Sequence, residues 1–522
     1  MSFPRHVVIV LALLALLAVL NLPAKANDVY IAQAASGSAN GSSCANPYAY
    51  TYFNISGNWT SGTPSGAQIG PGTTVHLCGT FTASAGAGSF LSVQGSGTSG
   101  KPITILWEAG AIVQAPYFGA DPGGIALGGH GYITLDGGTN GMLRNTANGT
   151  GLTYQQASSL IRDDSCGGNI TIKNLQLLDA YQHASGDPNG GESYNIYLRG
   201  CSNVTVGPGN TITQADVGFL FIYNGGESNL VIQGNTWRDA NQNIEVGSSD
   251  SSATSLTNVS VYGNTATGWS NWDEPGDGYH HNFFHPFTNT ANSSIVGTLL
   301  IYNNNIYGSV GQWVTSFIFL ENNNGGTGGS MGTWYIFNNV FHKTNVITGG
   351  GGDGMVVPCN GGSSGYIVNN TFVDDDSAST FPVMQTYGSG WSVENNVIDG
   401  GGYGLYADST LTTTNNNDYY GIVQGWKYNN IGYTFPLWKS ACGCDANSIT
   451  TSPLLNASYV PQSGSPVIGL GTNLTSLNIA ALNSDAAGNA RPSSGAWTAG
   501  AYSISSSSTG LQPPTGLTAA VQ

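Results

Sequence analysis

The chain has 522 residues, of which 8% are charged, with 12 Lys and Arg against 28 Asp and Glu and a formal net charge of −16. Hydrophobic residues make up 40% of it, which argues against a disordered chain, since disorder needs low hydrophobicity and high net charge. The abundance of Gly, Asn, Ser and Thr argues against a helical protein, because these residues disfavour helix interiors. The acidic balance also argues against a nucleic-acid partner, which requires clustered Lys and Arg.

The first 26 residues have the pattern of a signal peptide. Arg5 precedes an apolar stretch over residues 7–20, and Ala24-Lys25-Ala26 provides a small-residue cleavage site before Asn27. The apolar stretch is short for a membrane span, and no later segment is long and apolar enough to insert into a bilayer. We therefore expect a secreted protein, either extracellular or at the cell surface.

Seven cysteines follow the signal peptide, and their odd number leaves at least one thiol without an intramolecular partner. Cys44 and Cys78 flank a segment rich in Gly, Ser and Thr, and we expect them to form a disulfide that pins the N-terminal cap. Cys166 and Cys201 precede equivalent apolar runs, so they should lie one above the other, either bridged or simply stacked. Cys442-Gly443-Cys444 indicates a loop disulfide or a capped turn rather than a metal site.

A short phrase recurs along the chain, in which a β-rich run is followed by asparagine and then usually by an apolar residue. The marked asparagines are separated by irregular steps of 21 to 41 residues and lie at Asn174, Asn210, Asn235, Asn264, Asn305, Asn339, Asn370, Asn396 and Asn417. A second short apolar run precedes most of these phrases, and Gly, Asn and Ser bound each run, as is typical of strands. Since no helical period lies between the runs, the pattern predicts a parallel β-helix.

The repeated asparagines have a structural role in such a fold. An asparagine in the αL-tolerant bend between two strands can point inward and bond the equivalent asparagine of the next coil. At about 4.8 Å per coil, about ten to twelve coils would make a rod about 50 Å long.

The repeats resemble the right-handed parallel β-helix of the pectate-lyase-like family over about residues 70–430. Two N-terminal segments look like the opening coils of that family, and C-terminal segments are similar to the closing module of secreted bacterial β-helix proteins: 71–81, 95–105, 464–469, Asp485, 488–492 and 500–502. The resemblance implies an all-β, right-handed parallel β-helix but hardly specifies a reaction, because different functions are grafted onto one fold.

These features divide the chain into five expected parts. They are a signal peptide (1–26), an N-terminal cap with the first coils (27–100), the parallel β-helix (101–440), a closing module (441–503) and a flexible tail rich in Ser and Pro (504–522).

Titratable and aromatic side chains are densest at residues 272–285. This segment contains Trp272, Asp277, His280, His281 and His285. In a chain with so few charged residues, this density marks a candidate site.

Carboxylates from neighbouring coils are expected to join this segment. Side chains alternate along a strand, so Glu245, His285 and Glu321 face outward if Ile244, Phe284 and Ile318 point inward. The candidate catalytic residues are Asp277, His281, His285, Glu245, Glu321 and Asp239, and the candidate substrate-binding residues are Trp272, Trp237, Trp313, Arg238 and His280.

Several chemistries fit these residues. Paired carboxyls, preferably Asp277 with Glu245 or Glu321, can serve as acid and base on a glycosidic bond. A histidine or arginine beside carboxylates can instead abstract a proton in lyase chemistry. The histidines with Asp277 can also hold a metal, although their spacing matches no standard zinc motif. The alternative without chemistry is that these groups hydrogen-bond a long loop.

We therefore predict a secreted carbohydrate-active protein, a lyase or a glycoside hydrolase, that binds an extracellular polysaccharide along its groove. The alternative is a non-catalytic β-helix for glycan binding, adhesion or a surface matrix. The scarcity of Lys and Arg argues against a polyuronate lyase unless calcium, bound by Asp groups, neutralises the substrate. The sequence predicts neither the identity of the polysaccharide nor the oligomeric state.

Overall fold

The computed structural model describes residues 28–188, 191–248, 253–274, 281–312, 316–322, 329–345, 354–358, 363–376 and 381–504. The expected signal peptide, and the expected tail from residue 505 onward, lie outside these described residues. Within them, no helix has the length and apolar character needed to cross a membrane.

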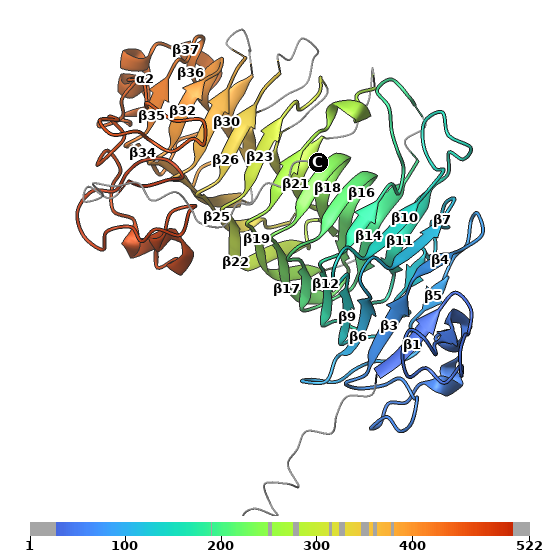
Figure 1. Cartoon of the computed structure of the whole chain (residues 1–522). Helices are drawn as coiled ribbons and strands as arrows, with labels where there is room; N and C mark the ends of the chain where they lie inside the picture. Colours follow the sequence, from blue (N-terminus) through green and yellow to red (C-terminus); the bar gives the residue numbers. More distant parts are fainter. Residues whose placement is uncertain are drawn as a thin grey trace, which may run out of the picture.

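The chain winds as a parallel β-helix in which successive coils add strands to three parallel ladders (Figure 1). Ladder A consists of β1 (Asp28–Ala32), β3 (Thr74–Cys78), β6 (Ile103–Trp107), β9 (Ile133–Asp136), β12 (Ile170–Lys173), β15 (Val204–Val206), β17 (Gly226–Gln233), β19 (Ser255–Tyr262), β22 (Ser294–Tyr302), β25 (Gly332–Phe337), β28 (Ser363–Val368), β31 (Trp391–Glu394) and β34 (Thr413–Asn415). The fold class expected from the sequence is confirmed.

Ladders B and C belong to one 23-stranded sheet because two long strands, β16 (Thr211–Tyr223) and β18 (Thr236–Ser248), run through both. The other strands of ladder B are β4 (Thr80–Thr82), β7 (Ile112–Ala115), β10 (Met142–Asn145), β13 (Gln176–Leu178), β20 (Thr265–Thr267), β23 (Asn305–Gly308), β26 (Val340–Lys343), β29 (Thr371–Asp374), β32 (Val397–Gly400) and β35 (Asp418–Tyr420). The other strands of ladder C are β5 (Leu91–Ser92), β8 (Ile125–Ala126), β11 (Ser158–Asp163), β14 (Ser193–Arg199), β21 (Asn282–Thr288), β24 (Ile318–Asn322), β27 (Val356–Pro358), β30 (Pro382–Thr386), β33 (Tyr403–Ala407) and β36 (Gly425–Tyr428).

Few elements lie outside the ladders. At the N-terminal end β2 (Tyr48–Ala49) pairs with β1, and at the other end β37 (Ile431–Tyr433) pairs antiparallel with β36. The helical elements of the described residues are α2 (Phe435–Cys442) and five short 3-10 segments, at Tyr50–Tyr52, Ser56–Asn58, Ser270–Trp272, Thr475–Leu477 and Ala480–Asn483.

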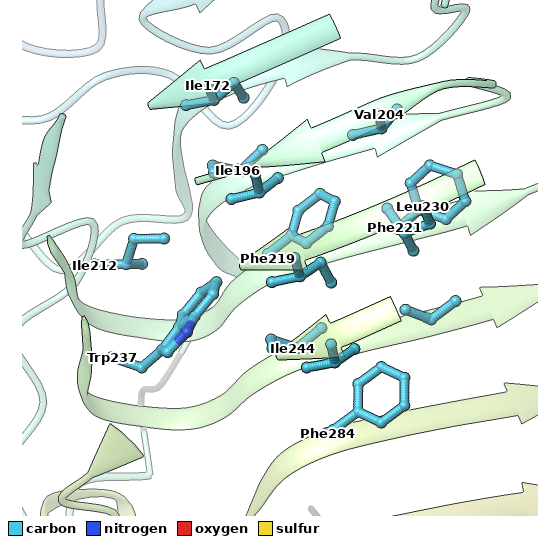
Figure 2. Close-up of a cluster of buried hydrophobic side chains, with 14 of the residues drawn as sticks. Ile172, Ile196, Val204, Ile212, Phe219, Phe221, Leu230, Trp237, Ile244 and Phe284 are labelled. Atoms are coloured by element: carbon cyan, nitrogen blue, oxygen red, sulfur yellow. The ribbon is translucent and has the colours of Figure 1, made fainter. Parts of the chain in front are cut away.

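Strand alternation fills the interior of the rod with apolar side chains. In ladder C, equivalent positions of successive coils stack Ile196, Phe219, Ile244, Phe284 and Ile318, all fully buried. Figure 2 shows part of this column. The register of the interior column fixes which residues of the same strands face outward, and so positions the candidate site.

An asparagine ladder joins the coils at the corner between ladders A and B. The side-chain Nδ2 of each member donates to Oδ1 of the next at 2.9–3.1 Å, along Asn210, Asn235, Asn264, Asn304, Asn339, Asn370, Asn396 and Asn417. Asp445 ends the series by accepting from Asn417 at 3.2 Å. All members are buried, so the ladder satisfies polar groups that would otherwise be stranded in the core.

The structure corrects two details of the expected ladder. Asn174 is not a member, because it adopts a left-handed conformation with φ 56° and leaves Leu175 at the ladder position. Asn304, rather than Asn305, is the member from its coil. The left-handed residue of each bend is also the one before the ladder asparagine, for example Asn338 with φ 56° before Asn339.

A closing module packs on the outer face of ladder A. Trp497, Leu474 and Leu482 of the module form a buried apolar cluster with Phe337 and Val368 of the ladder. The segment after α2 therefore folds back along the rod and covers apolar side chains that ladder A would otherwise expose.

The described part of the chain contains three disulfides. Cys44–Cys78 is confirmed, and the stacked pair Cys166–Cys201 is bridged. Cys442–Cys444 closes the turn after α2. The seventh cysteine, Cys359, lies outside the described residues.

Replacing one ladder asparagine should destabilise the rod. In Asn339→Ala, the backbone N–H of Asn304 and the carbonyl of Ile301 lose their partners at 3.0 and 2.9 Å. We expect the free energy of unfolding to fall by about 2–4 kcal/mol, since each stranded buried group costs about 1–3 kcal/mol, measured by urea denaturation. As control, Asn203→Gly removes an exposed asparagine from a left-handed position, φ 59°. Equal losses in both variants would contradict the structural importance of the ladder.

Candidate functional site

The candidate site lies on the outer face of ladder C, around β18 and β21. In β16 and β18 the chain passes from ladder B to ladder C without a loop, because Gln214 and Asp239 turn the corner in left-handed conformations, with φ 55° and 53°. The coils on both sides instead have long connections, between β13 and β14 and between β20 and β21.

These two flanking connections meet each other across the intervening coils. The ring of His183 stacks on Trp272 with centroids 4.1 Å apart and planes inclined by 12°. Gly186 N–H donates to the carbonyl of Asp273 at 2.7 Å, and His183 Nδ1 hydrogen-bonds the carbonyl of Asn271 at 2.7 Å. The contacts hold one edge of the site in place.

Two glutamates and a histidine from successive coils gather beside this edge. Glu245 of β18 is in register with His285 of β21. His285 Nε2 lies 2.9 Å from Oε2 of Glu321 in β24, and its Nδ1 lies 3.1 Å from Oε1 of Gln242. The imidazole ring, with 4% of its residue exposed, is therefore held in one orientation and positions Glu321.

Glu245 has a strongly perturbed titration. Burial, together with the negative charges of Asp216 and Glu321, raises the pKa of Glu245 from its usual 4.5 to about 8. The same environment raises the pKa of Tyr194, first through burial and then through the charges of nearby carboxylates, including Glu192, Asp216 and Glu245. Glu245 is therefore a carboxylic acid at neutral pH, as a proton donor in catalysis must be.

A second chain of contacts continues from Asp216 to the other side of the site. Asn241 Nδ2 donates to Asp216 Oδ1 at 2.8 Å, and Asn241 Oδ1 lies 2.6 Å from His281 Nδ1. On its other side, His281 Nε2 is 3.3 Å from Oδ1 of Asp273, which also accepts from the backbone N–H of Gln312 at 2.8 Å. This network connects coils on both sides of β18.

The structure brings together Glu245, His285 and Glu321 of the predicted site. Asp239 is half-buried at the corner of β18. Its backbone carbonyl accepts a hydrogen bond from Nε1 of Trp272 at 2.8 Å. Arg238 is exposed on ladder B. Asp277, His280 and Trp313 lie outside the described residues.

Three of the predicted roles are contradicted by burial. Trp237 is 0% exposed and points into the core, as Figure 2 shows, so it cannot stack on a sugar. Trp272, 4% exposed, stacks on His183 instead and fixes the flanking connections. His281 is 0% exposed, which leaves it as a group that positions Asp273 and Asn241 rather than one that reaches a substrate.

Asp216, Gln242 and Tyr194 belong to the site but were not predicted from the sequence. They lie on the neighbouring strands β14, β16 and β18. Tyr194 is in register with Val217, the residue after Asp216, and Val217 is in register with Gln242. Alignment of the asparagine repeats could have placed these positions on adjacent coils, but nothing in the residues themselves distinguishes them from other polar groups.

The possibility of a calcium ion was left open by the sequence. In the described part of the chain, no group of three or more His, Cys, Asp or Glu side chains is arranged to hold a metal ion.

The raised pKa of Glu245 predicts a pH-dependent stability. An unfolded glutamate loses its proton near pH 4.5, whereas the folded chain keeps it until about pH 8. The folded state thus binds the extra proton between these values, and stability falls as the pH rises through this window. Glu245→Gln should raise Tm relative to the wild type at pH 8 and above, with the difference shrinking toward pH 4.5.

The matched control for this measurement is the exposed Glu192→Gln, which should leave the shape of the Tm–pH curve unchanged. Parallel curves for the wild type and Glu245→Gln would contradict the perturbed titration.

No family model matches the chain, and no curated protein matches it. Among solved structures, the chain is similar to the crystal structure of pectate lyase Pel9A, with a TM-score of 0.44 and 16% sequence identity over 92% of this chain and 97% of that one.

Proposed function

We propose that the protein is secreted and binds a polysaccharide on the outer face of ladder C, where Glu245 and Glu321 hydrolyse its glycosidic bonds. The observation that carries the proposal is a carboxylic acid, Glu245, that stays protonated to about pH 8 beside a second carboxyl positioned by His285. Glycoside hydrolysis uses two carboxyl groups of this kind, one protonated and one ionised.

Each group has a distinct role in this proposal. Glu245 donates its proton to the oxygen of the scissile bond, so that the leaving sugar departs as an alcohol. Glu321, which accepts a hydrogen bond from His285 at 2.9 Å, acts as the carboxylate that takes a proton from the attacking water. His285 is a positioning residue, because its two ring nitrogens face Glu321 and Gln242.

The spacing of the coils supports hydrolysis with inversion. Glu245 and Glu321 lie in β18 and β24, with β21 between them. Since adjacent strands are about 4.8 Å apart, the two strands are separated by about 10 Å, and Glu321 lies two positions further along its strand than Glu245, because it is in register with Phe287 rather than with His285. Inverting enzymes have carboxyl separations of about 6.5–9.5 Å and retaining enzymes of about 5–5.5 Å.

Hydrolysis is favoured over elimination because the two histidines of the site that the structure describes, His281 and His285, are not placed as bases. His281 is fully buried, and His285 is 4% exposed with both ring nitrogens engaged. Secretion is supported by the signal-peptide pattern and by the three disulfides, which persist in oxidising compartments.

Reducing-sugar release from a panel of polysaccharides tests this proposal. Glu245→Gln and Glu321→Gln should each lower kcat by about 10²–10⁴-fold while affinity for the same glycan, measured by affinity electrophoresis, is retained. Activity of the wild type should decline above pH 8, as Glu245 loses its proton. Proton NMR of the fresh product should show the inverted anomer.

The exposed Glu192→Gln serves as the control and should keep full activity. Unchanged turnover in both site variants would refute the assignment of Glu245 and Glu321. A wild-type protein that binds glycan but releases no reducing ends would instead favour the non-catalytic β-helix.

A further inference from the structure

The charge distribution on ladder C limits which polysaccharide the site accepts. Glu245, Asp216 and Glu321 lie near enough to interact electrostatically, and Asp273 is connected to Asp216 through His281 and Asn241. Resting on the function proposed above, we infer that the substrate is an uncharged polysaccharide and not a polyuronate.

Basic side chains are missing from this region of the sequence itself. Between Arg199 and Lys427, the only Lys or Arg residues are Arg238 and Lys343. Arg238 is exposed on ladder B. Lys343, at the end of β26, is 1% exposed and pairs with Asp374 at 3.1 Å and Asp376 at 3.6 Å. Neither the middle strands of ladder C nor their connecting loops therefore supply a lysine or arginine to meet a sugar carboxylate.

Ladder C carries three other basic residues, Arg162, Arg199 and Lys427, on strands outside its middle ones. Arg199, at the end of β14, interacts with the hydroxyl of Tyr197, and the other two are also engaged locally. Arg162 donates to both carboxylate oxygens of Asp164, at 2.8 and 2.9 Å, and lies 4.1 Å from the ring centroid of Tyr197. Lys427 lies 4.3 Å from the ring centroid of Tyr403. These contacts orient the two cations along the surface of the rod and toward aromatic rings.

Aromatic rings also lie on this face of ladder C. The half-buried ring of Phe287 lies 5.3 Å from the ring of His285, and the buried ring of Phe319 packs 5.1 Å from it. The half-buried rings of Tyr194 and Tyr197 lie 5.4 Å apart on β14. Flat apolar rings with a few polar groups between them are typical of sites for neutral ligands.

A polyuronate would be repelled at this surface. It carries a negative charge on each sugar, and its binding would bring these charges against the carboxylates around Glu245 in a partly dry site, where like charges repel more strongly than in water. It would also hold Glu245 in its protonated form still more strongly. A neutral chain avoids this repulsion and keeps Glu245 free to donate its proton.

Affinity electrophoresis with matched neutral and acidic polymers tests the inference. The neutral set is arabinoxylan, galactomannan and mixed-linkage β-glucan, and the acidic set is polygalacturonate and alginate, each at low and at high ionic strength and with either calcium or EDTA. We expect at least one neutral polymer to bind about tenfold or more tightly than either polyuronate at low ionic strength, with little dependence on salt or calcium.

Charge variants test whether polyuronates bind weakly because the carboxylates of the site repel them or because they do not fit its shape. Glu321→Gln removes one negative charge from the site and should reduce the discrimination against polygalacturonate at low ionic strength. Glu394→Gln removes a half-buried charge from ladder A and should not.

The outcomes distinguish this inference from the proposed function. Tighter binding of a polyuronate than of every neutral polymer, with or without calcium, would overturn the inference and leave a polysaccharide site in place. Absence of binding to all five polymers would overturn the proposed function and the inference together. Equal discrimination by wild type, Glu321→Gln and Glu394→Gln would refute charge repulsion at the site as its cause.

Discussion

Hydrogen bonding between coils at the corner of ladders A and B is the constraint on which the rest of the structure depends. A parallel rod with this composition buries an amide side chain in coil after coil, and a buried amide is stable only when its donors and acceptors have partners. The ladder from Asn210 to Asn417 meets that demand with one repeated contact of 2.9–3.1 Å. It also fixes the register of the coils. The alignment of the strands in ladder C therefore depends on hydrogen bonds at a corner that takes no part in chemistry.

That alignment explains how a chain with so few charged residues concentrates them. Glu245, His285 and Glu321 come from positions far apart in sequence, yet the stacked register places them on successive coils. The long strands β16 and β18 lack loops at the corner, while the connections on either side meet through His183 and Trp272. Carboxyl groups are thereby brought together in a partly buried surface, and burial, together with their mutual repulsion, raises the pKa of Glu245 so that it holds its proton.

The parts of the structure that follow from periodicity could be predicted, and those that follow from loop packing could not. The parallel coils, the asparagine ladder, the stacked Cys166–Cys201 pair and the outward column of Glu245 and His285 all repeat with the register. Trp272 was misjudged because only the packed loops show that it is buried against His183. Trp237 lies on β18 at the inward position two residues after the ladder asparagine Asn235, so the repeat itself indicated its burial and it was wrongly assigned to a substrate surface. Asn174 was assigned to the ladder because a left-handed corner and a ladder position use the same residue type.

The most direct test of the central claim is the titration of Glu245 itself. The chain has seven glutamates, so selective ¹³C labelling of glutamate carboxyls gives a spectrum simple enough to follow by NMR across the pH range. The structure predicts one resonance with a midpoint at about pH 8 that is missing from Glu245→Gln. If the resonance that disappears in the variant titrates near the usual 4.5, the carboxyl groups of ladder C do not form the acid and carboxylate pair on which the proposed hydrolysis depends.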